Sequence, residues 1–143
     1  MDIRQITPRY AVSPQISVED IPALVDAGFT CLLCNRPDIE IPPSHQASAI
    51  QSAAEAAGLN FVVNPLTHDT MTPERLTLQR DTLETATGKV LAYCASGTRS
   101  TVAWMLGYAT DVPADDLLRA AAKEGYHLEA LRPQLEYLAN QAR

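Results

Sequence analysis

The chain has 143 residues, of which 46% are hydrophobic and 20% are charged, and its formal net charge at pH 7 is −6. A chain of this length can bury a core of its own, so a single domain is predicted over residues 1–143. The negative charge leaves no basic face for nucleic acid or for an anionic membrane, so neither partner is expected, and the oligomeric state stays open.

The cellular compartment is predicted from the N-terminal residues and the cysteines. The chain begins MDIRQ, which lacks the apolar stretch of a signal peptide. No apolar run approaches the roughly 20 residues that cross a bilayer. Three cysteines, an odd number, then predict free thiols in a reducing cytoplasm.

Strand and helix signals alternate along the chain, which predicts an α/β fold with a mostly parallel sheet covered by helices on both faces. In such sheets, ligands bind beyond the carboxyl ends of the strands. Glycine, proline and N-capping residues lie at most of the predicted boundaries between these helices and strands. The expected elements are, in order, a short edge strand at 10–13, a helix between Ser17 and Gly28, a strand at 30–34, an alanine-rich helix between Ser44 and Gly58, a strand at 60–64, a helix opened by Thr72 and Pro73, a strand at 89–93, a helix at 99–108, and two C-terminal helices opened by Pro113 and Pro133.

The residues expected to react with and bind a substrate lie in the segment after the strand at 89–93. Cys94 follows the strand directly, and the four residues 95–98 separate it from Arg99, where the next helix begins. Unpaired N–H groups and the dipole at a helix N-terminus favour a bound anion, and they also favour the thiolate, which is the nucleophilic form of cysteine. Arg99 adds a planar fork of donors that suits a tetrahedral oxyanion.

The spacing leaves two reaction classes open. Cysteine-dependent phosphatases usually place five residues between cysteine and arginine and a histidine before the cysteine, whereas this chain has four residues and Tyr93. Single-domain rhodanese sulfurtransferases often place four residues there, so the loop length alone favours sulfur transfer. The non-catalytic alternative is a buried Cys94 beside an Arg99 that pairs with a carboxylate.

Several segments together resemble a bacterial family, the phosphatase-like domain of the beta-lactamase hydrolase-like proteins. The resemblance extends over nearly the whole chain, and it implies a fold like that of the dual-specificity protein tyrosine phosphatases. Pro14 departs from the family pattern, which usually has glycine there, and Cys31 and Cys34 lie in a strand that more often has no cysteine. The segments that carry the resemblance are ITP at 6–8, VSPQIS at 12–17, AGF at 27–29, CNRPD at 34–38 and CASGTRS at 94–100.

The resemblance and the loop pattern assign roles within this segment. Cys94 is the predicted nucleophile, and Arg99 together with the backbone N–H groups of Ala95, Ser96, Gly97 and Thr98 is predicted to bind the anion. The resemblance implies that the Ser100 hydroxyl binds the thiolate or the leaving sulfur. The alternative for Ser100 is a first-turn residue that bonds to nearby backbone.

A phosphatase also needs a general acid for the leaving oxygen. Asp69 is the first choice, because the loop after the strand at 60–64 can reach over the Cys94 loop; the alternative is an ordinary turn aspartate. Asp38 is the second choice. Arg36 is expected to contact substrate, and the alternative is an internal pairing with Asp38 or with backbone.

The remaining cysteines and the histidines give weaker signals. Cys31 and Cys34 are three residues apart on a strand, so their side chains face opposite sides and cannot easily share one site. No metal site and no cofactor are predicted, since the histidines show no ligand spacing. By resemblance to phosphoinositide phosphatases, Cys34 is predicted to be a resolving thiol for Cys94; the alternative is an inert core residue.

The sequence therefore predicts a cytoplasmic, cysteine-dependent phosphatase-like hydrolase that acts on a small anionic or phosphorylated substrate through its Cys-x4-Arg loop. The alternative is a rhodanese-like sulfurtransferase, in which Cys94 carries a persulfide and Arg99 binds thiosulfate or a similar donor. A third, non-enzymatic interpretation is an anion-binding or redox-sensing module.

Overall fold

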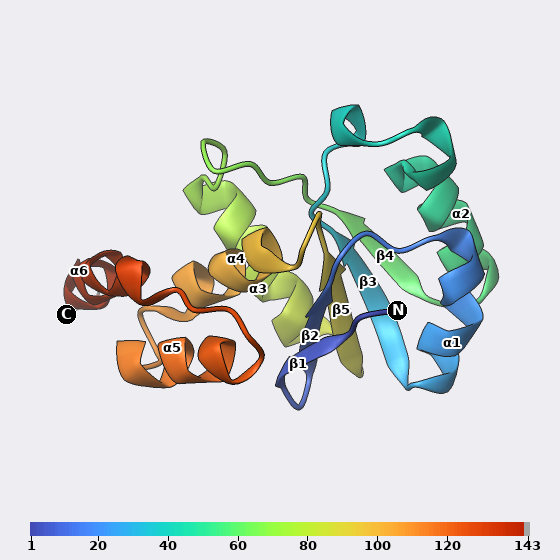
Figure 1. The fold of residues 1–143 in the computed structure, drawn as a ribbon. Helices are drawn as coiled ribbons and strands as arrows, with labels where there is room; N and C mark the ends of the chain where they lie inside the picture. Colours follow the sequence, from blue (N-terminus) through green and yellow to red (C-terminus); the bar gives the residue numbers. More distant parts are fainter. Residues whose placement is uncertain (142–143) are drawn as a thin grey trace.

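The computed structural model describes residues 1–141; residues 142 and 143, the last two of the predicted domain, lie outside the described residues. A central sheet carries helices on both faces (Figure 1). The elements are β1 (Arg4–Thr7), β2 (Tyr10–Ser13), α1 (Ile21–Asp26), β3 (Phe29–Cys34), α2 (Ala47–Ala56), β4 (Asn60–Val63), α3 (Pro73–Thr85), β5 (Lys89–Tyr93), α4 (Thr98–Tyr108), α5 (Ala114–Lys123) and α6 (Arg132–Gln141), with short 3₁₀ turns at Val18–Asp20, Asp38–Glu40, Pro43–His45 and Glu129–Leu131.

The sheet has five strands in the order β1-β2-β5-β3-β4. Strands β2, β5, β3 and β4 are parallel, and β1 pairs antiparallel with β2. The predicted α/β class and mostly parallel sheet are therefore confirmed. Strand β1 was not predicted, because of its four residues only Ile6 is buried and so short a segment shows no clear alternation. The prediction that residues 10–13 form an edge strand is therefore wrong, since β1 pairs with the outer side of β2.

Two separate apolar cores lie on the two faces of the sheet. Helices α1 and α2 cover one face, and α3, α4, α5 and α6 cover the other (Figure 1). Alternate residues of β3 enter different cores: Cys31 and Leu33 pack toward the α3–α6 side, while Leu32 and Cys34 pack toward the α1–α2 side. The prediction that Cys31 and Cys34 face opposite sides is confirmed.

Local capping interactions explain where several helices begin. The backbone N–H and the hydroxyl of Ser17 donate to the Asp20 carboxylate, at 2.9 and 3.3 Å, before α1. The Thr72 hydroxyl accepts from the Arg75 N–H at the start of α3. No helix within residues 1–141 is both long enough and apolar enough to cross a membrane.

The parallel strands all end at one edge of the sheet, and this edge positions the candidate site. Residues Ser13, Tyr93, Cys34 and Val63 are the last residues of β2, β5, β3 and β4. Register pairs join Ser13 to Tyr93 and Tyr93 to Cys34, so β5 ends between two neighbours. The loops that follow these strands therefore surround Cys94, as expected for a parallel sheet.

Candidate active site

The Cys94 loop is a tight turn between β5 and α4. Gly97 has φ +93°, a left-handed conformation that glycine adopts without strain, and its N–H donates to Cys94 Sγ at 3.1 Å. The N–H and the hydroxyl of Thr101 both donate to the Gly97 carbonyl, at 3.0 and 2.8 Å, which joins the loop to α4. The sulfur is thus held at a helix N-terminus, as predicted.

The loop presents both exposed and buried groups. Ala95 and Ser96 are exposed, whereas Cys94 has no exposed surface. The Thr98 N–H donates to the Ser96 hydroxyl, which in turn donates to the hydroxyl of Thr98. Within residues 1–141, the N–H groups of Ala95, Ser96 and Arg99 have no hydrogen-bond partner, so they are available to an oxyanion.

Arg99 is held by two other segments of the chain. Its Nη1 and Nη2 donate to the two carboxylate oxygens of Glu40, at 2.9 and 2.8 Å, and Nη1 also donates to the Leu66 carbonyl at 2.7 Å. Three of the five guanidinium donors are thereby used. The two on Nε and Nη2 have no hydrogen-bond partner within residues 1–141 and lie along one edge of the guanidinium, an arrangement that can bind two oxygens of one anion. A buried Cys94 beside an Arg99 paired with a carboxylate is also the arrangement of the non-catalytic alternative.

Glu40 is a site residue that the sequence did not reveal. It accepts from Arg99 and also from Arg36 Nε at 2.9 Å. Hydrogen bonds from Arg99, and more weakly from Arg36, hold the pKa of the Glu40 carboxyl below its ordinary value; the same contact with Glu40 raises the pKa of Arg99. Arg36 also donates from Nη2 to the Glu40 carbonyl at 3.5 Å, so it has the internal backbone contact of the alternative considered for it, and its carboxylate partner is Glu40, not Asp38.

Ser100 makes a different bond from the one implied by the resemblance. Its hydroxyl donates to Asn35 Oδ1 at 2.7 Å, in a fully buried position. A serine hydroxyl has one proton, so Ser100 does not also donate to Cys94 in this arrangement. Nor does the hydroxyl bond to nearby backbone, which was the alternative. Its observed role is to attach the first turn of α4 to the end of β3.

Asn35 belongs to a buried amide network beneath the loop. Its Nδ2 donates to the Asn64 carbonyl at 2.9 Å and to Gln79 Oε1 at 2.8 Å. Gln79 donates back to Asn35 Oδ1 and to the Tyr10 hydroxyl, which itself donates to the Ser100 carbonyl. All five residues are at most 2% exposed, so the network ties β2, β3, the end of β4, α3 and α4 together without water.

The two candidate acids have different surroundings. Asp69 is exposed at the tip of a turn closed by the Thr70 N–H and the Thr67 carbonyl, and its carboxylate has no hydrogen bond within residues 1–141. Asp38 is engaged, because its carboxylate accepts from the N–H of Ala47, the first residue of α2, at 2.8 Å. Asp38 therefore has a structural role as a helix cap.

Cys34 lies deep in the core beside the strand that leads to Cys94. It is in register with Tyr93, and both side chains pack toward α1 and α2. Its Sγ lies 3.6 Å from the Arg36 carbonyl, and burial raises its pKa. All three cysteines are free thiols. A disulfide between Cys34 and Cys94 stays a prediction.

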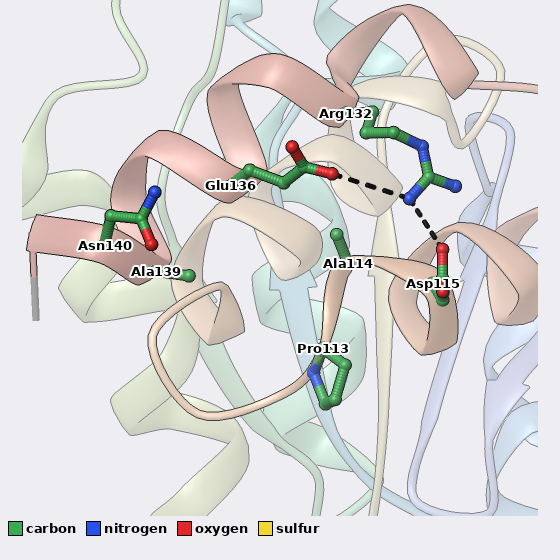
Figure 2. Close-up of a pocket in the computed structure, with 7 residues that line it drawn as sticks. All are labelled: Pro113, Ala114, Asp115, Arg132, Glu136, Ala139 and Asn140. Carbon is green, nitrogen blue, oxygen red and sulfur yellow. Dashed lines mark hydrogen bonds and ion pairs between the residues drawn. The ribbon is translucent and has the colours of Figure 1, made fainter. Parts of the chain in front are cut away.

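The cavity between α5 and α6 is unsuited to an anion. It has a volume of about 330 Å³, and Arg132 lines it (Figure 2). Asp115 and Glu136 pair with Arg132 at 2.6 and 3.7 Å, and Glu129 does so as well. Three carboxylates thus surround the charge of Arg132, whereas Arg99 pairs with Glu40 alone within residues 1–141. Within residues 1–141, no group of three or more His, Cys, Asp or Glu side chains is placed to hold a metal ion.

The chain is similar in sequence to one family of known proteins. Residues 2–111 match the family model described as the phosphatase-like domain of beta-lactamase hydrolase-like protein. Beta-lactamase hydrolase-like proteins of Agrobacterium fabrum and Xylella fastidiosa (strain Temecula1) are each 30% identical to the chain, over 92% and 78% of it. The chain spans only 31% and 26% of those two proteins.

Solved structures superimpose on nearly the whole of this chain. A candidate phosphatase from Neisseria meningitidis Z2491 superimposes with a TM-score of 0.84 at 29% identity, covering 96% of this chain and 99% of that one. Tk-PTP in its active form (TM-score 0.70, 19% identity, 99% of this chain and 95% of that one) and PTPMT1 (TM-score 0.72, 15% identity, 98% of both) share the fold. The phosphatase-like fold expected from the resemblance is confirmed.

The Glu40–Arg99 pair predicts a specific pH dependence of stability. Because the folded-state pKa of Glu40 lies below its unfolded value of about 4.3, the ionised carboxylate stabilises the fold above that pH, and this contribution is lost as the pH falls through the folded-state pKa. Replacing Glu40 by glutamine should lower the free energy of unfolding by about 1 kcal/mol at pH 7. The difference from wild type should shrink below about pH 4.

Urea unfolding of wild type and of Glu40→Gln between pH 3 and 8 measures this difference. Glu55→Gln is the matched control, because Glu55 is exposed on α2 and pairs with no arginine in the described part of the chain, residues 1–141. A Glu40→Gln difference that stays constant across this pH range would contradict the assignment.

Proposed function

Because the chain belongs to the family of phosphatase-like domains of beta-lactamase hydrolase-like proteins, we propose that it is a cysteine-dependent phosphatase whose substrate binds in the loop from Cys94 to Arg99. One observation carries the proposal. Within residues 1–141, Arg99 keeps a two-donor edge without a hydrogen-bond partner while Glu40 and Leu66 hold the rest of its guanidinium, and the N–H groups of Ala95, Ser96 and Arg99 also have no partner. The three free thiols fit a reducing compartment such as the cytoplasm.

The reaction would proceed in two displacements at phosphorus. The Cys94 thiolate attacks the phosphoryl group, a sulfur–phosphorus bond forms, and the bond to the leaving oxygen breaks as that oxygen takes a proton. Water then attacks the thiophosphate, releasing inorganic phosphate and returning the thiolate. Arg99 and the loop N–H groups would stabilise the equatorial oxygens in both steps. Since Cys94 has no exposed surface, the proposal requires side chains over the loop to move when substrate enters.

Asp69 is the better of the two candidate acids. The loop that carries it is tied to the site, because the Leu66 carbonyl accepts from Arg99. Its carboxylate is uncommitted, whereas Asp38 caps α2. The role requires the turn at 67–70 to bring Asp69 over the bound phosphoryl group, where it can protonate the leaving oxygen.

We expect Asp69→Asn to lower kcat for an alkyl phosphate, which needs protonation of its leaving oxygen, by about 100-fold. The loss should be much smaller for p-nitrophenyl phosphate, whose leaving group needs little protonation. Asp38→Asn serves as the control: it should lower the free energy of unfolding but leave the ratio of the two kcat values unchanged. Equal losses on both substrates for Asp69→Asn would remove Asp69 from this role.

Sulfur transfer is the second candidate function, and the spacing of the loop favours it. Four residues separate Cys94 from Arg99, and a persulfide mechanism needs no general acid, which agrees with an Asp69 that lies exposed and apart. In that reaction the Cys94 thiolate attacks the sulfane sulfur of thiosulfate, sulfite leaves, and the persulfide sulfur passes to an acceptor such as cyanide.

The products separate the two functions. Wild-type protein should release phosphate from p-nitrophenyl phosphate and form no thiocyanate from thiosulfate and cyanide. Cys94→Ser should reduce phosphate release to background, since a neutral hydroxyl replaces the thiolate, while Cys31→Ser, which alters a cysteine on the opposite side of β3 from Cys34, should retain it. Thiocyanate formation that depends on Cys94, without phosphate release, would establish the second function.

A further inference from the structure

The side chain of Tyr126, in the segment between α5 and α6, contacts the Cys94 loop. Tyr126 lies beyond residue 111, where the match to the family model ends, and its hydroxyl donates to the Ser96 carbonyl at 3.0 Å. We propose that Tyr126 is a positioning residue: it fixes the peptide unit between Ser96 and Gly97 so that the Gly97 N–H points toward Cys94. This inference rests on the proposed function, because it assigns Tyr126 to the loop that binds the anion.

The argument follows from the geometry of one peptide bond. The Ser96 carbonyl and the Gly97 N–H belong to the same planar trans unit, so they point in opposite directions. The carbonyl is held on one side by the Tyr126 hydroxyl at 3.0 Å, and the N–H on the other side meets Cys94 Sγ at 3.1 Å. Fixing the carbonyl therefore also fixes the direction of the N–H.

Gly97 is the residue that would allow this peptide unit to turn over. Glycine occupies positive and negative φ about equally, so its φ of +93° is not enforced by its own side chain. If the unit rotated, the Ser96 carbonyl oxygen would point toward Cys94 and toward any bound anion, where its negative end would repel both. A hydrogen bond to the carbonyl from outside the loop favours the orientation that accepts an anion.

Tyr126 is itself anchored to the fold. Its N–H donates to the Ala121 carbonyl, and the preceding Glu124 is bound to β1 through Arg4 Nη1 at 2.8 Å and the Gln5 N–H at 3.1 Å. The hydroxyl would lie only 2.2 Å from a Cβ at position 97, so its approach requires glycine there. Burial raises the pKa of Tyr126, which keeps the hydroxyl protonated and able to donate at neutral pH.

The test compares Tyr126→Phe, which removes only the hydroxyl, with Tyr137→Phe, whose ring is 62% exposed on α6. The first measurement is the dissociation constant of orthovanadate, read from its protection of Cys94 against iodoacetamide. The second is the hydrogen-exchange rate of the Gly97 amide, and urea unfolding checks that each variant is folded. Tyr126→Phe should bind vanadate roughly tenfold more weakly, about 1.4 kcal/mol, and exchange the Gly97 amide faster, with unfolding close to wild type.

The outcomes distinguish this inference from the proposed function. Vanadate affinity and Gly97 exchange that match wild type in Tyr126→Phe would overturn the role of Tyr126. If vanadate does not protect Cys94 of the wild-type protein, the proposal that the loop binds an anion is overturned. The exchange rate of the Gly97 amide in wild type and in Tyr126→Phe would then decide alone whether Tyr126 holds the peptide unit. Equal changes in Tyr126→Phe and Tyr137→Phe would show a general loss of packing and would also reject the proposal.

Discussion

The buried amide network beneath the Cys94 loop is the interaction on which the site depends. Asn35, Asn64 and Gln79 satisfy one another without water, and through Tyr10 and Ser100 they join the strand ends to the first turn of α4. An unsatisfied amide in this position costs about 1–3 kcal/mol, so the network tolerates few alternative arrangements. The loop that carries Cys94 is thereby attached to the sheet through buried hydrogen bonds.

Residues from other segments bind some groups of the Cys94 loop, and other groups of the loop have no partner within residues 1–141. Glu40 and the Leu66 carbonyl bind the outer donors of Arg99, and Tyr126 binds the Ser96 carbonyl. In Arg99 these contacts leave the donors on Nε and one on Nη2 without a partner within residues 1–141, and at Ser96 the contact holds the carbonyl opposite the Gly97 N–H, which donates to Cys94. Donors fixed in this way need no reorganisation when charge develops during a reaction, which is how such sites stabilise transition states.

Structural features that depend on residues close together in the sequence were predictable. The buried strand at 89–93, the loop from Cys94 and the helix after it form one continuous signal, and all three lie where the pattern places them. Contacts between distant segments were not predictable. Glu40 and Arg99 are 59 residues apart, Asn35 and Gln79 are 44 apart, and Tyr126 and Ser96 are 30 apart. The family resemblance suggested a hydrogen bond from Ser100 to the sulfur. The sequence could not show that Asn35 lies close to Ser100 and accepts its proton instead.

The central claim is that Cys94 carries the phosphoryl group during turnover. Rapid acid quenching of the protein with p-nitrophenyl phosphate, followed by mass spectrometry of the Cys94 peptide, measures this directly. The account predicts a peptide heavier by one phosphoryl group in wild type and in Asp69→Asn, and none in Cys94→Ser. Phosphate release with an unmodified Cys94 peptide at every quench time, or a peptide heavier by one sulfur atom after thiosulfate, would contradict it.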